Sequence, residues 1–432
     1  MSVSSSQRPS ALEHQARIYL RGGAGLTPPV PVDPLSLEEK AQKYMSPAAA
    51  AYIIGGAGRE RTIAFNRQDF DRWQIVPRML RDVGTRDTSS SFLGQTIASP
   101  LMLAPIGVLE MVHKKADLAV AAAATATGTP MIISNQASFP MESIARVLGE
   151  TPRMFQLYWS KSNELVKSLV KRAEDIGSQA IVLTLDTTML GWRNRDLEEA
   201  YLPFLRGQGI AQYTSDPVFR KLAESFQPDV SVSKPPVTPA TIAMLLKQAD
   251  NVPGSFLKNL TSGKALRLVR AFIHYFVRPS LNWENLAFLQ DCTSLPIILK
   301  GILHPEDAKL AVQYGVQGII VSNHGGRQVD GAMSAIEALP KVVSAVEGKI
   351  PVWMDSGIRT GADMFKAIAL GAQAVCLGRP YVYGLTLAGK KGVQSVIQHL
   401  QAEFELTMGL SGCKNIAEIR QSSLEERVSW RN

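Results

Sequence analysis

Residues 322–330, with the sequence SNHGGRQVD, combine side chains that could carry out acid–base chemistry and bind an anion. His324 can accept a proton near neutral pH. Arg327 can hold a carboxylate through two parallel hydrogen bonds, and the two glycines between them let the backbone turn tightly or approach a ligand. The apolar run 318–321 (GIIV) comes directly before this segment and predicts a buried strand. The sequence therefore predicts a strand that ends in a loop carrying a base and an anion-binding group.

Seven further short runs of apolar and β-branched residues predict strands of the same kind. Continuous apolar runs, in contrast to alternating ones, are typical of strands buried on both faces. A predicted helical segment follows each run, which favours an α/β fold, a (β/α)8 or TIM barrel. A doubly wound open sheet is the alternative, but no GxGxxG follows the first strand. The eight predicted strands are 101–105, 131–134, 154–158, 180–186, 296–300, 318–322, 352–355 and 374–378.

Polar side chains stand at the C-terminal ends of these predicted strands. In a barrel of this type, those ends meet on one face, where active sites form. A polar residue at one strand end is common, but so many together are not expected by chance. The sequence therefore predicts one shared site that contains Ser134, Gln156, Tyr158, Thr184, Asp186, Lys300, Ser322, His324, Asp355 and Arg379.

The predicted loops after the last two strands could hold a phosphate group. The first loop is 355–361 (DSGIRTG), and the second contains Gly378 and Arg379. Loops at these two places form the usual phosphate site of this fold. Glycine N–H groups and arginine side chains suit a phosphate dianion. Lys300 could then lie against an anionic ring, with a Schiff-base amine as the alternative for this lysine.

The regular spacing of strands breaks between the fourth and fifth strands, where an insertion occupies about 195–285. A long insertion after a barrel strand lies on the catalytic face. It is predicted to be a mobile lid, partly helical near 239–249, with a disordered surface insertion as the alternative. Residues 1–34, rich in Ser, Gly and Pro, predict a flexible N-terminal arm before a barrel domain at 35–432. One helix is predicted from Leu37 through Tyr52.

The composition argues against several classes of protein. Hydrophobic residues make up 45% and charged residues 19%, which is typical of a globular enzyme. The net charge of +8 suits an anionic ligand, although surface lysines without a function explain it equally well, and no basic run with interleaved aromatics predicts nucleic-acid binding. Three scattered cysteines and six unpaired histidines predict neither disulfides nor a metal site. Without an apolar span or a signal sequence, we expect a cytoplasmic protein with no membrane partner.

The sequence resembles the FMN-dependent L-2-hydroxy acid oxidases and dehydrogenases, the family that includes glycolate oxidase and lactate oxidase. The similarity runs from about Leu37 to Leu424, and the intact segment SNHGGRQ at 322–328 is highly specific for the family. Further segments are most similar to the lactate 2-monooxygenase branch, namely 104–108 (APIGV), 191–197 (GWRNRDL), 203–207 (PFLRG), 216–219 (DPVF) and 355–363 (DSGIRTGAD).

The resemblance implies a catalytic set at matching positions. His324 would be the base that removes a proton from the substrate, while Asp186 would orient its ring and stabilise the imidazolium. Both arginines of the set would bind the substrate carboxylate, and both tyrosines would hydrogen-bond the substrate. From position alone, packing in the core is the alternative for Tyr52. The implied set is Tyr52, Tyr158, Asp186, Arg193, His324 and Arg327.

The resemblance also implies that FMN lies across the barrel mouth. The implied cofactor-binding residues are Ala104, Ser134, Gln156, Thr184, Lys300, Ser322, Asp355, Gly357, Arg359, Gly378 and Arg379. The first four would contact the isoalloxazine ring, and Lys300 would stabilise negative charge on the reduced ring. Ser322 would contact the ribityl chain, and the last five would hold the ribityl and phosphate end.

The implied activity is oxidation of an L-2-hydroxy acid with oxygen as the electron acceptor. If the lid retains the keto acid, peroxide would decarboxylate it, so that lactate and oxygen give acetate, carbon dioxide and water. If the product leaves first, the enzyme would be an oxidase that releases the keto acid and hydrogen peroxide. Gln136 stands where several family members have an aromatic or apolar residue, which favours a larger or more polar acid than lactate.

Other features of the activity stay open at this point. The residues do not distinguish hydride transfer from a carbanion. A homotetramer is implied by the resemblance. A flavin-binding scaffold without turnover is a further alternative, against which the intact His324, Arg327, Arg193 and Asp186 argue.

Overall fold

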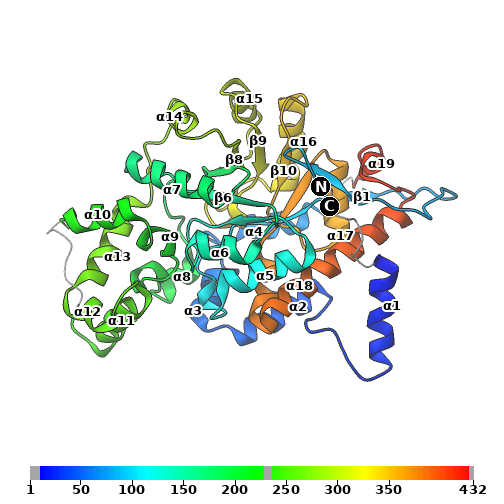
Figure 1. Cartoon of the computed structure of the whole chain (residues 1–432). Helices are drawn as coiled ribbons and strands as arrows, with labels where there is room; N and C mark the ends of the chain where they lie inside the picture. The colour runs from blue at the N-terminus through cyan, green and yellow to red at the C-terminus, as the bar shows by residue number, and fades with distance from the viewer. Residues whose placement is uncertain (1–9, 228–235, 428–432) are drawn as a thin grey trace.

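A computed structural model of the chain describes residues 10–227 and 236–427. The first nine residues of the predicted arm and residues 228–235 of the predicted insertion lie outside the described residues. Within them, a closed barrel of eight parallel strands occupies the centre of the molecule (Figure 1).

The barrel strands are the eight that the apolar runs predicted, so the (β/α)8 fold is confirmed and the open sheet is wrong. Each strand pairs with the next along the chain, and the pairing of Val375 with Leu101 closes the ring. The strands are β4 (Leu101–Leu103), β5 (Met131–Ile133), β6 (Arg153–Leu157), β7 (Ile181–Thr184), β8 (Ile297–Ile302), β9 (Gly318–Val321), β10 (Val352–Met354) and β11 (Ala374–Leu377).

The two ends of the barrel differ in what fills them. Alternate strand residues, among them Met102, Val182 and Ile320, pack inside the barrel as an apolar cluster. At the N-terminal end, the hairpin of β2 (Ser90–Phe92) and β3 (Gln95–Ile97) adds its own apolar residues to this cluster, and the ring centroids of Phe92 and Trp353 lie 5.4 Å apart. Because this end is plugged by apolar side chains, the polar C-terminal end is the one available for a ligand.

A helix follows each barrel strand and covers the outside of the sheet. These helices are α5 (Ala116–Thr127), α6 (Met141–Leu148), α7 (Asn163–Asp175), α14 (Asn285–Cys292), α15 (Pro305–Gln313), α16 (Ala335–Val346), α17 (Gly361–Ala369) and α18 (Arg379–Leu410). The last of them bends at Ala388 and Gly389, whose backbone angles are not helical.

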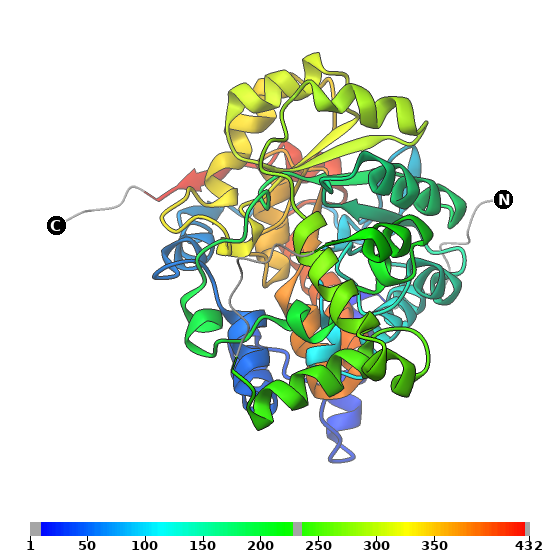
Figure 2. The ribbon, with the colours of Figure 1, turned by 90° about the vertical axis from the view of Figure 1, so that its left-hand side faces the viewer.

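The insertion between β7 and β8 is largely helical in its described part, so the alternative of a disordered insertion is wrong there. A helix begins where the sequence predicted one, since α11 spans Pro239–Asn251. Figure 2, which looks from the side of the insertion, shows these helices in front of the barrel. The insertion contains α8 (Asn194–Glu198), η2 (Pro203–Arg206), α9 (Ala211–Thr214), α10 (Pro217–Ser225), α11, α12 (Phe256–Thr261) and α13 (Lys264–Tyr275).

The single helix predicted from Leu37 to Tyr52 is wrong, because the structure has two helices there. They are α2 (Pro34–Tyr44) and α3 (Pro47–Ile54). The Ser46 side chain accepts a hydrogen bond from the backbone N–H of Ala49 and so caps the start of α3, with Pro47 at its first position. Proline is favoured at that position and disfavours a helical residue before it, which explains the break.

Part of the predicted N-terminal arm is also helical. The helix α1 (Ala11–Gly22) starts with a reciprocal capping box between Ser10 and Glu13, and it packs against α18. Figure 1 shows α1 at the edge of the molecule, away from the insertion. The division of the chain into an arm and a barrel domain stays a prediction.

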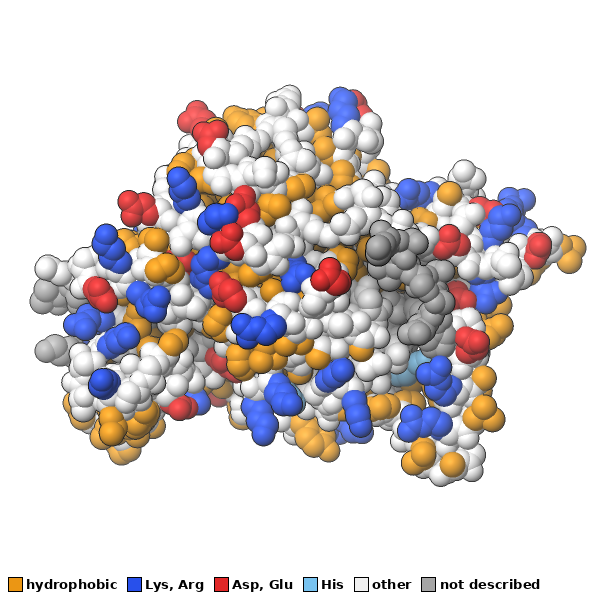
Figure 3. All heavy atoms as spheres, in the orientation of Figure 1, with side chains coloured by type: hydrophobic (Ala, Val, Ile, Leu, Met, Phe, Trp, Pro, Cys, Tyr) orange, Lys and Arg blue, Asp and Glu red, His pale blue; other side chains and the backbone are white. Residues whose placement is uncertain are grey.

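A short two-stranded sheet outside the barrel joins segments from the two ends of the chain. Strands β1 (Trp73–Ile75) and β12 (Leu424–Glu426) pair antiparallel outside the barrel. Acidic and basic side chains are interspersed over the face seen in Figure 3, with apolar side chains between them. No helix in residues 10–227 and 236–427 is both long enough and apolar enough to cross a membrane.

Candidate active site

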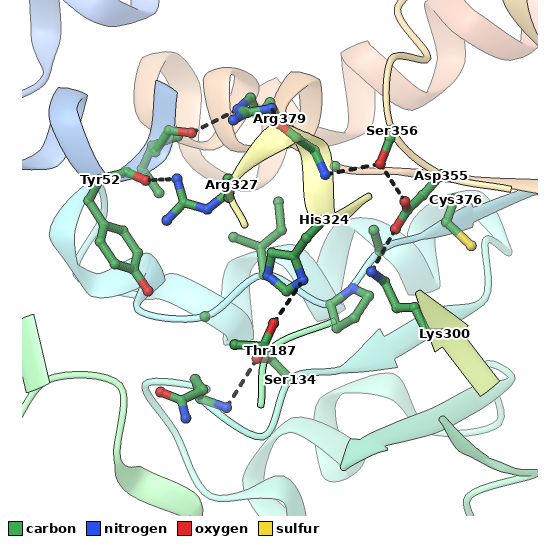
Figure 4. A pocket seen from close by; sticks show the side chains of 18 of the residues that line it. Tyr52, Ser134, Thr187, Lys300, His324, Arg327, Asp355, Ser356, Cys376 and Arg379 are labelled. Atoms are coloured by element: carbon green, nitrogen blue, oxygen red, sulfur yellow. Dashed lines mark hydrogen bonds and ion pairs between the residues drawn. The ribbon is translucent and has the colours of Figure 1, made fainter. Parts of the chain in front are cut away.

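The C-terminal ends of the strands surround one cavity of about 1070 Å³, part of which is open to solvent (Figure 4). Gln156, Thr184 and Ser322 are buried and do not line this cavity, and Asp186 contacts a lining residue, His324. The structure therefore brings the predicted residues together in one place. Those that line the cavity are Tyr52, Ala104, Ser134, Tyr158, Arg193, Lys300, His324, Arg327, Asp355, Gly357, Arg359, Gly378 and Arg379.

The imidazole of His324 is held by Asp186 in an orientation that leaves one nitrogen free for a ligand. Nδ1 of His324 lies 2.7 Å from Oδ1 of Asp186, which directs Nε2 away from the carboxylate. His324 belongs to η3 (His324–Gly326) and has a φ of 57°, an uncommon backbone conformation for a residue with a side chain. Its N–H donates to Oγ of Ser322 at 3.0 Å, and the next N–H, of Gly325, donates to Oγ of Ser356 at 3.0 Å. These contacts hold the turn that aims the base.

The charges of the pair are consistent with a neutral base beside an ionised carboxylate. Burial lowers the pKa of His324 below its ordinary value, although Asp186 opposes the shift. For Asp186, burial would raise the pKa, but the charges of His324 and Lys300 and two hydrogen bonds lower it instead. His324 is therefore available to accept a proton at neutral pH, and Asp186 can stabilise the imidazolium that results.

Lys300 is a buried cation at the base of the cavity. Its Nζ donates to Oγ of Ser322 at 2.8 Å and lies 3.1 Å from Asp355 and 3.7 Å from Asp186. Burial would lower the pKa of Lys300, but the two carboxylates raise it above the ordinary value. The amine is therefore protonated, which suits the stabilisation of an anionic group and not nucleophilic attack on a carbonyl.

Arg327 is a half-buried cation that lacks a carboxylate partner among the described residues. It donates through Nη1 to the carbonyl oxygens of Tyr52 and Gly55, and no carboxylate of the described residues lies within ion-pair distance of it. Burial and the charge of Arg193 lower the pKa of Arg327 to about 9, so the group stays charged at neutral pH. Arg193 donates to the carbonyl oxygen of Arg327 at 3.2 Å and to Oε1 of Gln328 at 3.1 Å. The two guanidinium groups thus form a site for an anion.

The two tyrosines of the predicted set lie in the same cavity, so packing alone does not describe Tyr52. The guanidinium of Arg327 lies 4.9 Å from the centre of the Tyr52 ring. Burial raises the pKa of Tyr52, and burial together with the charge of Asp186 raises the pKa of Tyr158 to about 12. Both hydroxyls are therefore protonated at neutral pH and can donate hydrogen bonds to a ligand.

A second anion-binding end lies where β10 and β11 finish. Arg379 is the first residue of α18, and its guanidinium donates to the carbonyl oxygens of Ile53, Gly55 and Gly325 at 2.8–3.1 Å. Burial lowers the pKa of Arg379. Gly357 has a φ of 104°, and a Cβ there would lie 2.2 Å from the carbonyl oxygen of Asn66. A helix N-terminus, a half-buried arginine and a glycine loop together suit a phosphate group.

Next to the lining residues Ser134 and Lys300, two buried polar atoms without partners are of the kind that can hydrogen-bond the edge of a flavin ring. Oγ1 of Thr184 and Nε2 of Gln156 have no hydrogen-bond partner among the described residues. The other end of the Gln156 amide is fixed, because its Oε1 accepts the N–H of Asn135 at 2.9 Å. Ala104 uses its N–H and its carbonyl oxygen within the protein, with Leu377 and Tyr381, and keeps one carbonyl lone pair. The residues present therefore fit FMN as a cofactor.

The insertion contributes the apolar side of the cavity. Phe204 of η2 and Phe276, which follows α13, line the cavity. The ring of Phe204 contacts Phe272, Phe276 and Tyr52 at centroid distances of 5.3, 5.9 and 6.5 Å. The insertion is thus packed on the barrel mouth beside the base and the arginines.

Several residues of the site were not predicted from the sequence. Thr187 donates from Oγ1 to Oδ1 of Asp186 at 2.9 Å and lies 3.3 Å from Nδ1 of His324. Ser356 donates to Asp355 at 2.8 Å, and Gln328 donates to the carbonyl oxygens of Asp186 and Met189. Each lies one residue from a predicted one in the sequence, and that adjacency was the available signal. Ser322 was predicted to contact the ribityl chain. Its Oγ accepts hydrogen bonds from Nζ of Lys300 and from the N–H of His324.

The fold and the site define a flavin-dependent α/β-barrel oxidoreductase. The family model described as FMN-dependent dehydrogenase matches residues 41–426. An L-lactate oxidase from Lysinibacillus sphaericus is 39% identical, with 92% of this chain and 93% of the relative covered. The human 2-hydroxyacid oxidase 1 is 38% identical, with 88% and 93% covered. A solved structure of mandelate oxidase with 3,3-difluoro-2-hydroxy-3-phenylpropionic acid matches with a TM-score of 0.73 and 33% identity, over 92% of this chain and all of that one.

The chain belongs to the FMN-dependent dehydrogenase family. The resemblance to the FMN-dependent 2-hydroxy acid oxidases stated from the sequence is confirmed, and so is FMN as the cofactor. The protein is an FMN-dependent 2-hydroxy acid oxidoreductase. The Schiff-base alternative for Lys300 is therefore wrong.

Proposed function

We propose that the protein oxidises an L-2-hydroxy acid with oxygen as the acceptor and retains the product long enough for a monooxygenase outcome. With L-lactate, the simplest such substrate, the products are acetate, carbon dioxide and water. The observation that carries the proposal is the His324–Asp186 pair beside Arg327, a half-buried cation without a carboxylate partner in the described residues. A 2-hydroxy acid supplies both the missing carboxylate and a proton for the base.

In this proposal, different residues of the site bind the substrate, accept its proton and stabilise negative charge. Arg327 and Arg193 hold the substrate carboxylate, and Tyr52 and Tyr158 donate hydrogen bonds to it or to its hydroxyl. His324 takes a substrate proton at Nε2, since Nδ1 is engaged by Asp186. Bound FMN supplies a two-electron acceptor that oxygen can reoxidise. Lys300, protonated between two carboxylates, stabilises negative charge at the base of the cavity.

The cover over the cavity supports product retention. Phe204 and Phe276 of the insertion line the cavity and pack with Phe272 in one aromatic cluster. A cover of this kind slows the exchange of a small keto acid with solvent, which is the condition for its reaction with peroxide. The second candidate is an oxidase that releases the keto acid and hydrogen peroxide, and the name oxidase borne by the relatives favours it.

The test is turnover of the purified flavoprotein with L-lactate in air, with acetate, pyruvate and peroxide measured together. Acetate without free peroxide supports the monooxygenase outcome. Pyruvate with an equal amount of peroxide makes the protein an oxidase. If no L-2-hydroxy acid bleaches the flavin anaerobically, the proposed oxidation itself is wrong, and the protein is a flavin-binding scaffold.

We also propose the homotetramer that the resemblance implies. The helix α1 exposes Leu12, Tyr19 and Leu20, and exposed apolar side chains of this size are frequent at subunit contacts. Sedimentation of the flavoprotein measures its mass in solution, and a monomer of 47.0 kDa would contradict the proposal.

A further inference from the structure

Gln136 presents an unpaired amide to the cavity. The residue lines the cavity and is 5% exposed. Neither its Nε2 nor its Oε1 has a hydrogen-bond partner among the residues that the structure describes. A buried amide without a partner is costly, so such groups are normally satisfied by protein, water or ligand. Because the described protein atoms do not satisfy this amide, a ligand group is its candidate partner.

The backbone on both sides of the side chain fixes where the amide lies. The N–H of Gln136 donates to Oγ of Ser134 at 3.1 Å, and its carbonyl oxygen accepts the N–H of Val108 at 2.9 Å. Gly107 packs so closely that a Cβ there would lie 2.6 Å from Cβ of Gln136. The side chain therefore starts from an anchored position, which lowers the entropic cost of binding a ligand group.

Gln136 lies where the barrel meets the insertion. A Cβ on Gly209 would lie 3.0 Å from the carbonyl oxygen of Gln136. Phe204 of the insertion lines the same cavity and contacts Tyr52, whose ring lies against Arg327. A substrate whose carboxylate is bound by Arg327 therefore has this wall of the cavity available for its side chain.

The acidic groups behind this wall do not favour an anionic side chain on the substrate. The N–H of Ser138 donates to Asp117 at 2.8 Å, and Oγ of Ser138 accepts the N–H of Glu110 at 3.1 Å. Oε1 of Glu110 also accepts the N–H of Gly209 at 2.8 Å. Glu110 and Asp117 thus flank the loop that carries Gln136. Burial raises the pKa of each to about 7, so both are only partly ionised at neutral pH. They supply no counter-charge to a second carboxylate on the substrate, which would lose its hydration on entering this part of the cavity.

We propose that Gln136 hydrogen-bonds a neutral polar group on the substrate, and that the preferred substrates are L-2-hydroxy acids with a hydroxyl or a carboxamide on the side chain. A glutamine amide both donates and accepts, which matches both of these groups. An apolar side chain of the same size leaves the amide unpaired and is disfavoured. The inference rests on the proposed oxidation of an L-2-hydroxy acid.

The test compares substrates of equal size and different polarity. L-Glycerate is paired with L-2-hydroxybutanoate, and the 4-amide of L-malate is paired with L-2-hydroxy-4-methylpentanoate. We expect kcat/KM to be at least about tenfold higher for the polar member of at least one pair. We also expect L-malate, with its second carboxylate, to be used less well than its 4-amide. Equal or better use of both apolar members overturns the inference.

A substitution of Gln136 tests whether the preference for polar substrate side chains depends on this residue. Gln136→Leu keeps a similar volume without the amide, so the polar-to-apolar ratio of kcat/KM should fall about tenfold or more. An unchanged ratio overturns the assignment. The flavin absorbance of the variant shows whether the variant is folded. If the variant does not fold, the comparison of substrates in the unmodified protein still tests the inference. If no acid reduces the flavin, the proposed function fails as well, whereas oxidation without a polar preference removes this inference alone.

Discussion

The hydrogen bond between His324 and Asp186 links the protonation of the base to the charge of its partner. Burial lowers the pKa of His324, and the Asp186 carboxylate opposes that shift. A base is active in its neutral form, so kcat/KM should rise with pH through the pKa of His324, at a pH below the ordinary value of about 6.5. The acidic limb of the pH profile is therefore expected in mildly acidic solution.

Replacement of the carboxylate tests this link. In Asp186→Asn, the charge that raises the pKa of His324 is gone, so the acidic limb should move to lower pH. The plateau of kcat/KM should fall about 10²-fold or more, because nothing then stabilises the imidazolium. The measurement is kcat/KM against pH for both proteins. An acidic limb that stays in place or moves to higher pH would contradict the assignment.

Thr187 is expected to act as a positioning residue for the same pair. Its hydroxyl lies 2.9 Å from Oδ1 of Asp186 and 3.3 Å from Nδ1 of His324. Thr187→Val removes the hydroxyl at constant shape, so kcat should fall about tenfold with little change in KM. Thr187→Ser restores the hydroxyl and serves as the control. If both variants behave alike, the hydroxyl has no part in holding the pair.

At the scale of the elements, local patterns in the sequence were enough to find the barrel. The apolar runs end within one or two residues of most observed strands, because burial on both faces leaves a continuous local signal. Contacts between distant segments left no such signal. The pairing of β1 with β12, the packing of Phe204 against Tyr52 and the contact of Thr187 with His324 all depend on the folded chain. For the same reason, the family resemblance and not the local pattern placed Tyr52 in the site.

The loop after β10 depends on the absence of a side chain at Gly357. A Cβ there would lie 2.2 Å from the carbonyl oxygen of Asn66, and the φ of 104° disfavours any other residue. Gly357→Ala should therefore lower the thermal midpoint by about 5 °C or more and weaken FMN retention. Absorbance of the purified protein measures the bound FMN.

Gly128→Ala is the matched control for that substitution. Gly128 has a φ of 63°, but a Cβ there would meet nothing within 4 Å. This variant carries backbone strain without a clash, at a cost of about 1 kcal/mol. It should keep its FMN. Equal effects of the two substitutions would show that the close approach of Asn66 to Gly357 is unimportant.

At the scale of the whole molecule, the N-terminal helix is fastened to the barrel but lies outside the site. The N–H of Ala11 donates to Glu405 at 3.1 Å, and the rings of His14 and His399 approach to 3.0 Å through Nε2 and Nδ1. No residue of α1 lines the cavity. Removal of residues 1–26 should therefore leave FMN content and kcat unchanged while lowering the urea midpoint of unfolding.

His14→Ala measures how much of the stability lost on truncation comes from the contact between His14 and His399. It should lower the urea midpoint by less than the truncation does, because the rest of α1 remains packed on α18. Loss of FMN from the truncated protein would show instead that the arm is required for the site.

The position of the insertion affects how enzymes with this architecture can diverge. The strands on either side of it, β7 and β8, pair directly with each other, from Ile181 with Ile297 to Thr184 with Lys300. The sheet therefore closes regardless of what the chain does between them. Mutations that lengthen, shorten or exchange the insertion can change the residues that cover the substrate. The base, the arginines and the residues that fit FMN can stay unchanged, because most of them lie on the barrel. New substrate ranges in such a lineage should arise first through loop-length changes in this segment, ahead of substitutions in the strands.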